Sequence, residues 1–103
     1  MKKAKIFVNG IFAGEIQEIA RGKQYRFVYQ EDYNGPSVSL GMPLSKSIYD
    51  YDKFPPFFEG LLPEGMMLEG LLRYTKIDRD DLMAQLIAVG GDLVGNVTVE
   101  AAK

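Results

Sequence analysis

The side chains available for chemistry in this chain are carboxylates, amines, guanidinium groups, hydroxyls and amides, because the sequence contains neither histidine nor cysteine. Ser-His-Asp and Cys-His nucleophiles, thiol redox chemistry and the usual zinc ligands are therefore excluded. The sequence also lacks a Gly-x-Gly-x-x-Gly or Walker-type phosphate loop. We expect no catalysis by this chain, and we assign no catalytic residue, metal-ligating residue or cofactor.

The nearest approach to a metal-binding pattern is a group of aspartates at residues 78, 80 and 81. An EF-hand would need a glycine and a distal glutamate at fixed spacing, and neither is present. Aspartates also suit the positive N-terminal end of a helix. We therefore predict that Asp78 is a helix N-cap and that Asp80 and Asp81 stabilise the first turn.

The densest apolar run, residues 54–74, is interrupted by Pro63-Glu64-Gly65 near its middle. A single helix would be broken there, because proline ends a helix and an internal glycine costs about 1 kcal/mol. We predict two short helices joined at Pro63, which would be the first residue of the second. Gly60, Gly65 and Gly70 turn by about 140° per step on a helix, so they share no face and no phosphate-binding role is assigned to them.

The second of these helices is predicted to have an apolar face that packs on a sheet. At about 100° per residue, one broad side of the helix carries five residues. They are Met67, Leu68, Leu71, Leu72 and Thr75.

Met66 falls nearly opposite that face, beside Glu69, Gly70 and Arg73, so we expect it to be exposed at the start of the helix. An exposed methionine is adaptable and suits a binding surface. A single exposed apolar residue is also normal in a soluble domain and needs no function. The charged residues around it are likewise compatible with an ordinary solvated face.

The composition is that of one globular domain, residues 1–103, with a net charge of -2 and a pI of about 5.1. Bulk attraction to nucleic acid or to anionic lipid is not expected at this charge. No apolar run approaches the length of a membrane span, and the N-terminus enters a strand pattern rather than a signal peptide. The absence of cysteine is compatible with a cytoplasmic location.

The first half of the chain predicts an antiparallel sheet. Asn9-Gly10 between the apolar-rich runs 3–8 and 11–16 predicts a hairpin with a type I′ turn. A third strand is predicted at 25–30 and a fourth at 37–42, stopped by Pro43. Residues 43–53 are predicted to be an irregular loop, either pinned in place by Tyr49 and Tyr51 or used for recognition.

The second half predicts a helical layer and a closing strand. Apolar residues of 82–89 form one helical stripe that ends at Gly90-Gly91, and Val97 and Val99 alternate with polar residues in a last strand. The expected fold is α+β, with an antiparallel sheet of about five strands, two or three helices on one face, and the last strand returning to the sheet.

Several motifs together resemble the N-terminal subdomain of HipA-type kinases. They are residues 56–65 (PFFEGLLPEG), 91–97 (GDLVGNV), the Asn9-Gly10 hairpin, the helix cap at Ile77-Asp78 and residues 39–44 (SLGMPL). The resemblance covers nearly the whole chain. In that family the subdomain precedes a kinase core, and nothing resembling the kinase Gly-rich loop, catalytic Asp motif or magnesium-binding motif is found here.

Free-standing copies of this subdomain resemble the HipS-type antitoxins of tripartite HipBST toxin–antitoxin systems. The resemblance implies a HipT-like serine/threonine kinase toxin as the partner, which the small chain neutralises, and a HipB-like DNA-binding protein as a third member. It implies no direct contact of this chain with nucleic acid or membrane. The alternative is a structural subunit that completes a HipA-like kinase without inhibiting it.

The resemblance also points to the residues that meet the kinase. Many relatives carry tryptophan after Pro-Glu-Gly, and in the HipS-like case this aromatic is implicated in reaching the kinase active site. Met66 stands at that position here. The expected partner-binding residues are Glu59, Pro63, Glu64, Gly65, Met66, Glu69 and Arg73.

Overall fold

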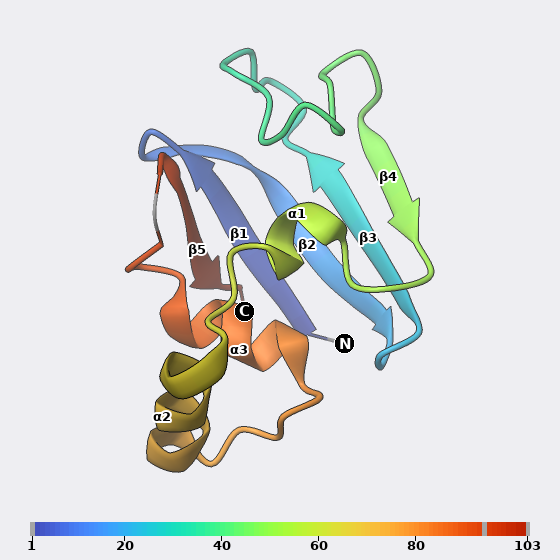
Figure 1. Cartoon of the computed structure of the whole chain (residues 1–103). Coiled ribbons are helices and arrows are strands. Elements are labelled where there is room, and N and C mark those ends of the chain that lie inside the picture. Colours follow the sequence, from blue (N-terminus) through green and yellow to red (C-terminus); the bar gives the residue numbers. More distant parts are fainter. Residues whose placement is uncertain (1, 94, 103) are drawn as a thin grey trace.

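The computed structural model describes residues 2–93 and 95–102, so Val94 of the 91–97 motif lies outside the described residues. Five strands form one antiparallel sheet in the order β4-β3-β2-β1-β5. Their bounds are β1 Lys2–Val8, β2 Ile11–Ala20, β3 Gln24–Tyr29, β4 Ile48–Tyr51 and β5 Val97–Ala101. The last strand pairs with the first, which confirms the predicted α+β fold with a returning strand (Figure 1).

The β1–β2 hairpin forms as predicted. Asn9 and Gly10 both have positive φ, 52° and 79°, as a type I′ turn requires. Behind the turn, Ala4, Ile6 and Val8 alternate with more exposed residues and are buried on one face of the sheet. The period-2 apolar pattern therefore sets which face of β1 meets the helices.

The fourth strand is not where the sequence pattern placed it. Residues 37–42 form a loop, and Leu40 is 99% exposed although Val38 and Met42 are buried. The Tyr29 hydroxyl accepts a hydrogen bond from the Val38 N–H at 2.9 Å and donates one to the Met42 carbonyl. The Met42 N–H in turn donates to the Ser39 carbonyl at 3.0 Å. These bonds replace a strand ladder, so the two buried side chains are brought together by a turn.

β4 lies instead within the segment predicted to be an irregular loop. Ile48–Tyr51 pairs with β3, with Tyr49 opposite Phe27 and Tyr51 opposite Tyr25. Both tyrosines are half-buried, and the Tyr49 ring packs edge-on against Tyr29 with centroids 6.5 Å apart. The tyrosines do anchor this segment, but as members of a strand.

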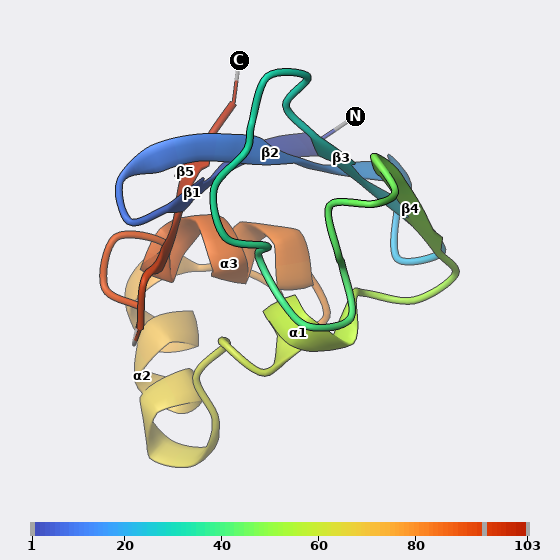
Figure 2. The same ribbon diagram turned by 90° about the horizontal axis from the view of Figure 1, so that it is seen from above.

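Three helices follow β4, and two of them cover the sheet. They are α1 Pro56–Glu59, α2 Gly65–Thr75 and α3 Leu82–Val89. Figure 2 shows α1 and α3 beneath the sheet and α2 farther from it. α3 packs on β1 and β5, and Gly90 at its end lies so close to β5 that an added Cβ would be 2.1 Å from the Val99 carbonyl oxygen. Within the described residues, no helix is both long and apolar enough to span a membrane.

Two predicted helix starts are wrong. Pro63 is not the first residue of α2; it lies two residues before Gly65, with Glu64 as the N-cap. Asp78 is not the N-cap of α3; Asp81 is, and its side chain accepts a hydrogen bond from the Ala84 N–H at 3.1 Å. Helix ends are poorly fixed by local sequence where several capping residues stand in a row.

Candidate partner-binding surface

α1 is held to the sheet by one aromatic anchor. Phe58 is fully buried, and its ring lies 6.0 Å from that of Phe27 in β3 and 5.2 Å from that of Phe57. Glu59, the last residue of α1, is exposed. The four-residue helix thus fixes the start of the candidate surface against the core and leaves its end in solvent.

The Pro63-Glu64-Gly65 segment reorients the chain between α1 and α2. Turn hydrogen bonds from the N–H groups of Leu61 and Leu62 continue α1 as far as the proline. Glu64 is then extended, with φ -135° and ψ 167°, and Gly65 has φ +59°, where a side chain would be strained. This change of direction starts α2 with its first side chains pointing away from the sheet.

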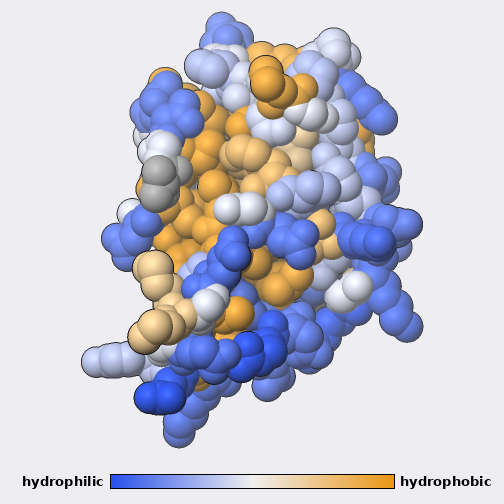
Figure 3. Space-filling model, in the orientation of Figure 1, coloured by the Kyte–Doolittle hydropathy of each residue, from blue (hydrophilic) through white to orange (hydrophobic). Residues whose placement is uncertain are grey.

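Met66 is exposed as predicted, at 91%, on the first turn of α2. Two other large side chains of this helix are also highly exposed, Met67 at 76% and Tyr74 at 92%. Figure 3 shows hydrophobic surface between β5 and α1 that continues toward α2. Large apolar side chains gathered in this way are typical of an interaction site.

The predicted packing of α2 on the sheet is wrong. No residue of α2 is buried, and Leu68, Leu71 and Leu72 are only partly covered. The 3.6-residue period correctly indicated an amphipathic helix, but α3 and α1 already cover the sheet. Part of the apolar side of α2 therefore packs against the other helices, and the rest of that side is exposed to solvent.

The open part is a groove of about 580 Å³ between α2 and the C-terminal end of α3. The sequence pattern did not predict it, because three of its α2 residues, Met67, Leu71 and Thr75, were placed on the face expected to pack on the sheet. The i, i+3, i+4, i+7 spacing of the α2 residues that line it is the signal that could have found it. The α2 residues are Met67, Gly70, Leu71, Tyr74 and Thr75, and Leu61, Pro63, Ala88, Val89, Asp92 and Leu93 complete the lining.

The charged residues assigned to the surface are all exposed, and one of them forms an ion pair. Glu69 lies 2.7 Å from Arg79 and ties α2 to the loop before α3. Both side chains are more than half exposed, so the pair stabilises the fold only weakly. Within the described residues, Glu59, Glu64 and Arg73 form no intramolecular ion pair and remain available to a partner.

The structure thus brings the predicted site residues onto one continuous segment, from the end of α1 to the third turn of α2. Glu59, Pro63 and Glu64 lie on the approach, and Gly65, Met66, Glu69 and Arg73 lie on α2. On the helix, Met66 and Arg73 lie on the same side about two turns apart, and the groove wall begins at the next residue, Met67. Within the described part of the chain, no group of three or more acidic side chains is placed to hold a metal ion.

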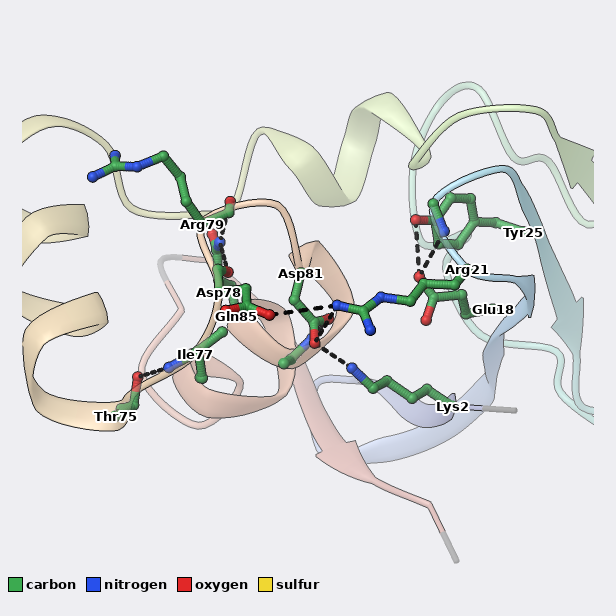
Figure 4. Close-up of polar contacts among 12 residues, drawn as sticks. Lys2, Glu18, Arg21, Tyr25, Thr75, Ile77, Asp78, Arg79, Asp81 and Gln85 are labelled. Carbon is green, nitrogen blue, oxygen red and sulfur yellow. Dashed lines mark hydrogen bonds and ion pairs between the residues drawn. The ribbon is translucent and has the colours of Figure 1, made fainter.

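A polar cluster holds α3, and with it the groove, against the sheet (Figure 4). The Lys2 ammonium donates to the Asp81 carboxylate, and Arg21 approaches Asp78 at 3.6 Å. The Gln85 amide donates to the Arg79 carbonyl at 2.9 Å. Burial alone would raise the pKa of Asp81, but its hydrogen bonds and the charges of Lys2 and Arg21 outweigh that effect and leave the pKa below its usual value.

Asp81→Asn is expected to lower the unfolding free energy by about 1 kcal/mol at pH 7, because asparagine still caps the helix but loses the ion pair. The folded-state pKa is depressed, so this stabilisation is present above about pH 4 and is lost as the pH falls through the folded-state pKa. Urea unfolding at a series of pH values measures the difference. A difference between the two proteins that stayed constant into acid would contradict the assignment.

The carboxylate of Glu18 is buried and has a structural role. It is 6% exposed and accepts hydrogen bonds from the Tyr25 hydroxyl at 3.0 Å and from the Gly22 N–H at 3.2 Å. Burial, followed by the bond and charge of Glu18, raises the pKa of Tyr25 to about 12. Glu18 thus ties the two strands and the turn of the β2–β3 hairpin together.

Comparison with known proteins decides the family. The model of the HipA N-terminal domain matches residues 4–100. This chain belongs to the HipA N-terminal domain family. A protein of Haemophilus influenzae, itself uncharacterised, is 31% identical over 103 residues, which is 100% of this chain and 95% of that protein. The solved structure of the "N-terminal domain of HipA toxin" superposes with a TM-score of 0.77 at 29% identity, over 100% of this chain and 94% of that one.

The resemblance inferred from the motifs is thereby confirmed. The matched family model is that of the N-terminal domain and extends over both the sheet and the helical layer. Membership of this family points to association with a HipA-like partner.

Proposed function

We propose that this chain binds a HipA-like serine/threonine kinase and neutralises it, as a HipS-type antitoxin. The observation that carries the proposal is Met66, which is 91% exposed at the start of a helix that does not pack on the sheet. In the HipS-like case the residue at this position is the one implicated in reaching the kinase active site. The proposed contact residues are Glu59, Pro63, Glu64, Gly65, Met66, Glu69 and Arg73.

Inhibition of this kind needs no catalytic group on the small chain. Phosphoryl transfer depends on positioning ATP, metal ions and substrate, so a side chain inserted beside the ATP-binding loops can prevent the kinase lobes from closing. A methionine fills an apolar pocket adaptably, because it is unbranched and has three rotatable bonds. The neighbouring carboxylates of Glu59 and Glu64 are free to meet cations at the rim of such a pocket.

The proposed setting is a cytoplasmic tripartite toxin–antitoxin system. A HipB-like DNA-binding protein is the third member and carries the DNA contact. The net charge of -2 supports a division of labour in which this chain does not bind DNA itself. The family kinases phosphorylate protein substrates such as aminoacyl-tRNA synthetases, and this chain takes no part in that chemistry.

A structural subunit that completes the kinase without inhibiting it is the second candidate. It is favoured by the matching solved structure, in which the same domain belongs to a HipA toxin. Co-expression of this chain with a HipA-like kinase toxin from the same organism distinguishes the two. Restored growth supports an antitoxin, and unchanged or increased toxicity supports a structural subunit.

A further inference from the structure

Gly70 stands in the middle of α2 without a structural reason in the free molecule. It has ordinary helical backbone rather than a positive φ, and a Cβ added there would meet nothing within 4 Å. An internal helix glycine is costly relative to alanine, because it leaves more backbone freedom to be lost on folding. By contrast, Gly65 is needed for its φ and Gly90 for its close approach to β5.

Three of the four residues one turn away from Gly70 are apolar and open to solvent, and the fourth is Arg73. Met66 and Tyr74, at i-4 and i+4, are 91% and 92% exposed, and Met67 at i-3 is 76% exposed. Because Gly70 has no side chain, it leaves a depression on the helix surface between the exposed side chains of Met66, Met67 and Tyr74. It also lines the groove that runs between α2 and the end of α3.

We propose that this groove seats an amphipathic helix of the kinase, which crosses α2 at Gly70. The inference rests on the proposed function, because it names the part of the same partner that the surface receives. A missing side chain lets two helices approach closely, and a hydrophobic groove of this kind receives the apolar face of an amphipathic helix. The position of Met66 at the edge of the groove makes the groove continuous with the proposed inhibitory contact.

The charges around the groove define the polar flank of the incoming helix. Asp92 lines the groove and is exposed, and Glu64 is exposed at the start of α2. A basic flank beside the apolar stripe of the kinase helix therefore complements this surface, and the complex weakens as salt rises.

The test compares stability and binding in Gly70→Ala. The variant is expected to melt about 4 to 8 °C higher than the wild type, because alanine is the better helix former. It is also expected to bind the purified HipA-like kinase at least about tenfold more weakly, because a methyl group separates the helices. Gly70→Leu should weaken binding further, and Asp92→Lys should weaken binding and reduce its dependence on salt.

Gly41→Ala is the matched control, since its Cβ would meet only the Ser39 hydroxyl at an ordinary 3.7 Å and it lies in the loop before β4, outside the groove. Melting is followed by circular dichroism and binding by titration calorimetry.

If Gly70→Ala and Gly70→Leu bind as tightly as the wild type, the groove proposal is wrong while kinase binding stands. If the wild type does not bind the kinase, the proposed function and this inference both fail. A lower melting temperature for Gly70→Ala would show that the fold itself needs the glycine, and would overturn the inference.

Discussion

Met66→Asp is expected to abolish protection against the co-expressed HipA-like kinase and to leave the fold intact. The side chain is 91% exposed in the free chain, so its replacement removes no core contact. In the complex, an aspartate would place a charge in an apolar pocket without a partner. A central interface residue of this kind contributes about 2 kcal/mol or more, so we expect at least about a 30-fold loss of affinity. Growth of the co-expressing cells and titration calorimetry measure the two effects.

Ile11→Asp is the matched control, because Ile11 is also an exposed apolar residue, at 62%, but follows the β1–β2 turn away from α2. It should protect as well as the wild type. Met66→Leu keeps an apolar side chain of similar size and should retain most of the protection. The site assignment is wrong if Met66→Asp binds and neutralises the kinase as well as the wild type does.

Phe58→Ala is expected to give the largest loss of stability, about 3 to 5 kcal/mol. Phe58 is fully buried and joins α1 to the sheet through Phe27, so its removal opens a cavity between the layers. A domain of this size has about 5 to 15 kcal/mol of stability, so much of it would be lost. Urea unfolding followed by circular dichroism measures the change. Protection against the kinase should fall as well, because α1 fixes the start of the proposed surface.

The control for Phe58 is its neighbour, Phe57, which is only partly buried. Phe57→Ala removes the same chemical group and should cost clearly less. Equal losses for the two variants, or a loss below about 1 kcal/mol for Phe58→Ala, would contradict the role of Phe58 as the anchor.

The elements with strong local chemistry were predictable from the sequence. Asn9-Gly10 specifies its own turn geometry, and alternation in β1, β3 and β5 identifies their buried faces. α3 was predictable because its apolar stripe ends at Gly90. In each case the local pattern and the tertiary environment agree.

The errors arose where tertiary contacts decided between local alternatives. Val38 and Met42 have strand-like spacing, but the hydroxyl of Tyr29 organises them into a turn, and this contact spans 9 and 13 residues. Asp78 and Asp81 can both cap a helix, and the choice of Asp81 is accompanied by its ion pair with Lys2 at the other end of the chain. Neither long-range partner is visible in the local pattern.

The sequence predicted one part of the candidate site, the exposed Met66, but not the groove beside it. The exposure of Met66 followed from helical periodicity, and the structure agrees with it. The groove did not follow, because periodicity shows that α2 has an apolar side but not what covers it. Only the positions of α1 and α3 reveal that the side formed by Met67, Gly70 and Tyr74 remains open.

The most direct test of the account is phosphoryl transfer by the purified kinase, measured with labelled ATP as this chain is added. The account predicts that transfer falls as the chain is added and is largely suppressed near one equivalent, whereas Met66→Asp at the same concentration leaves it unchanged. A rate that is unaffected or increased by a wild-type chain that demonstrably binds the kinase would contradict the antitoxin role and favour a structural subunit.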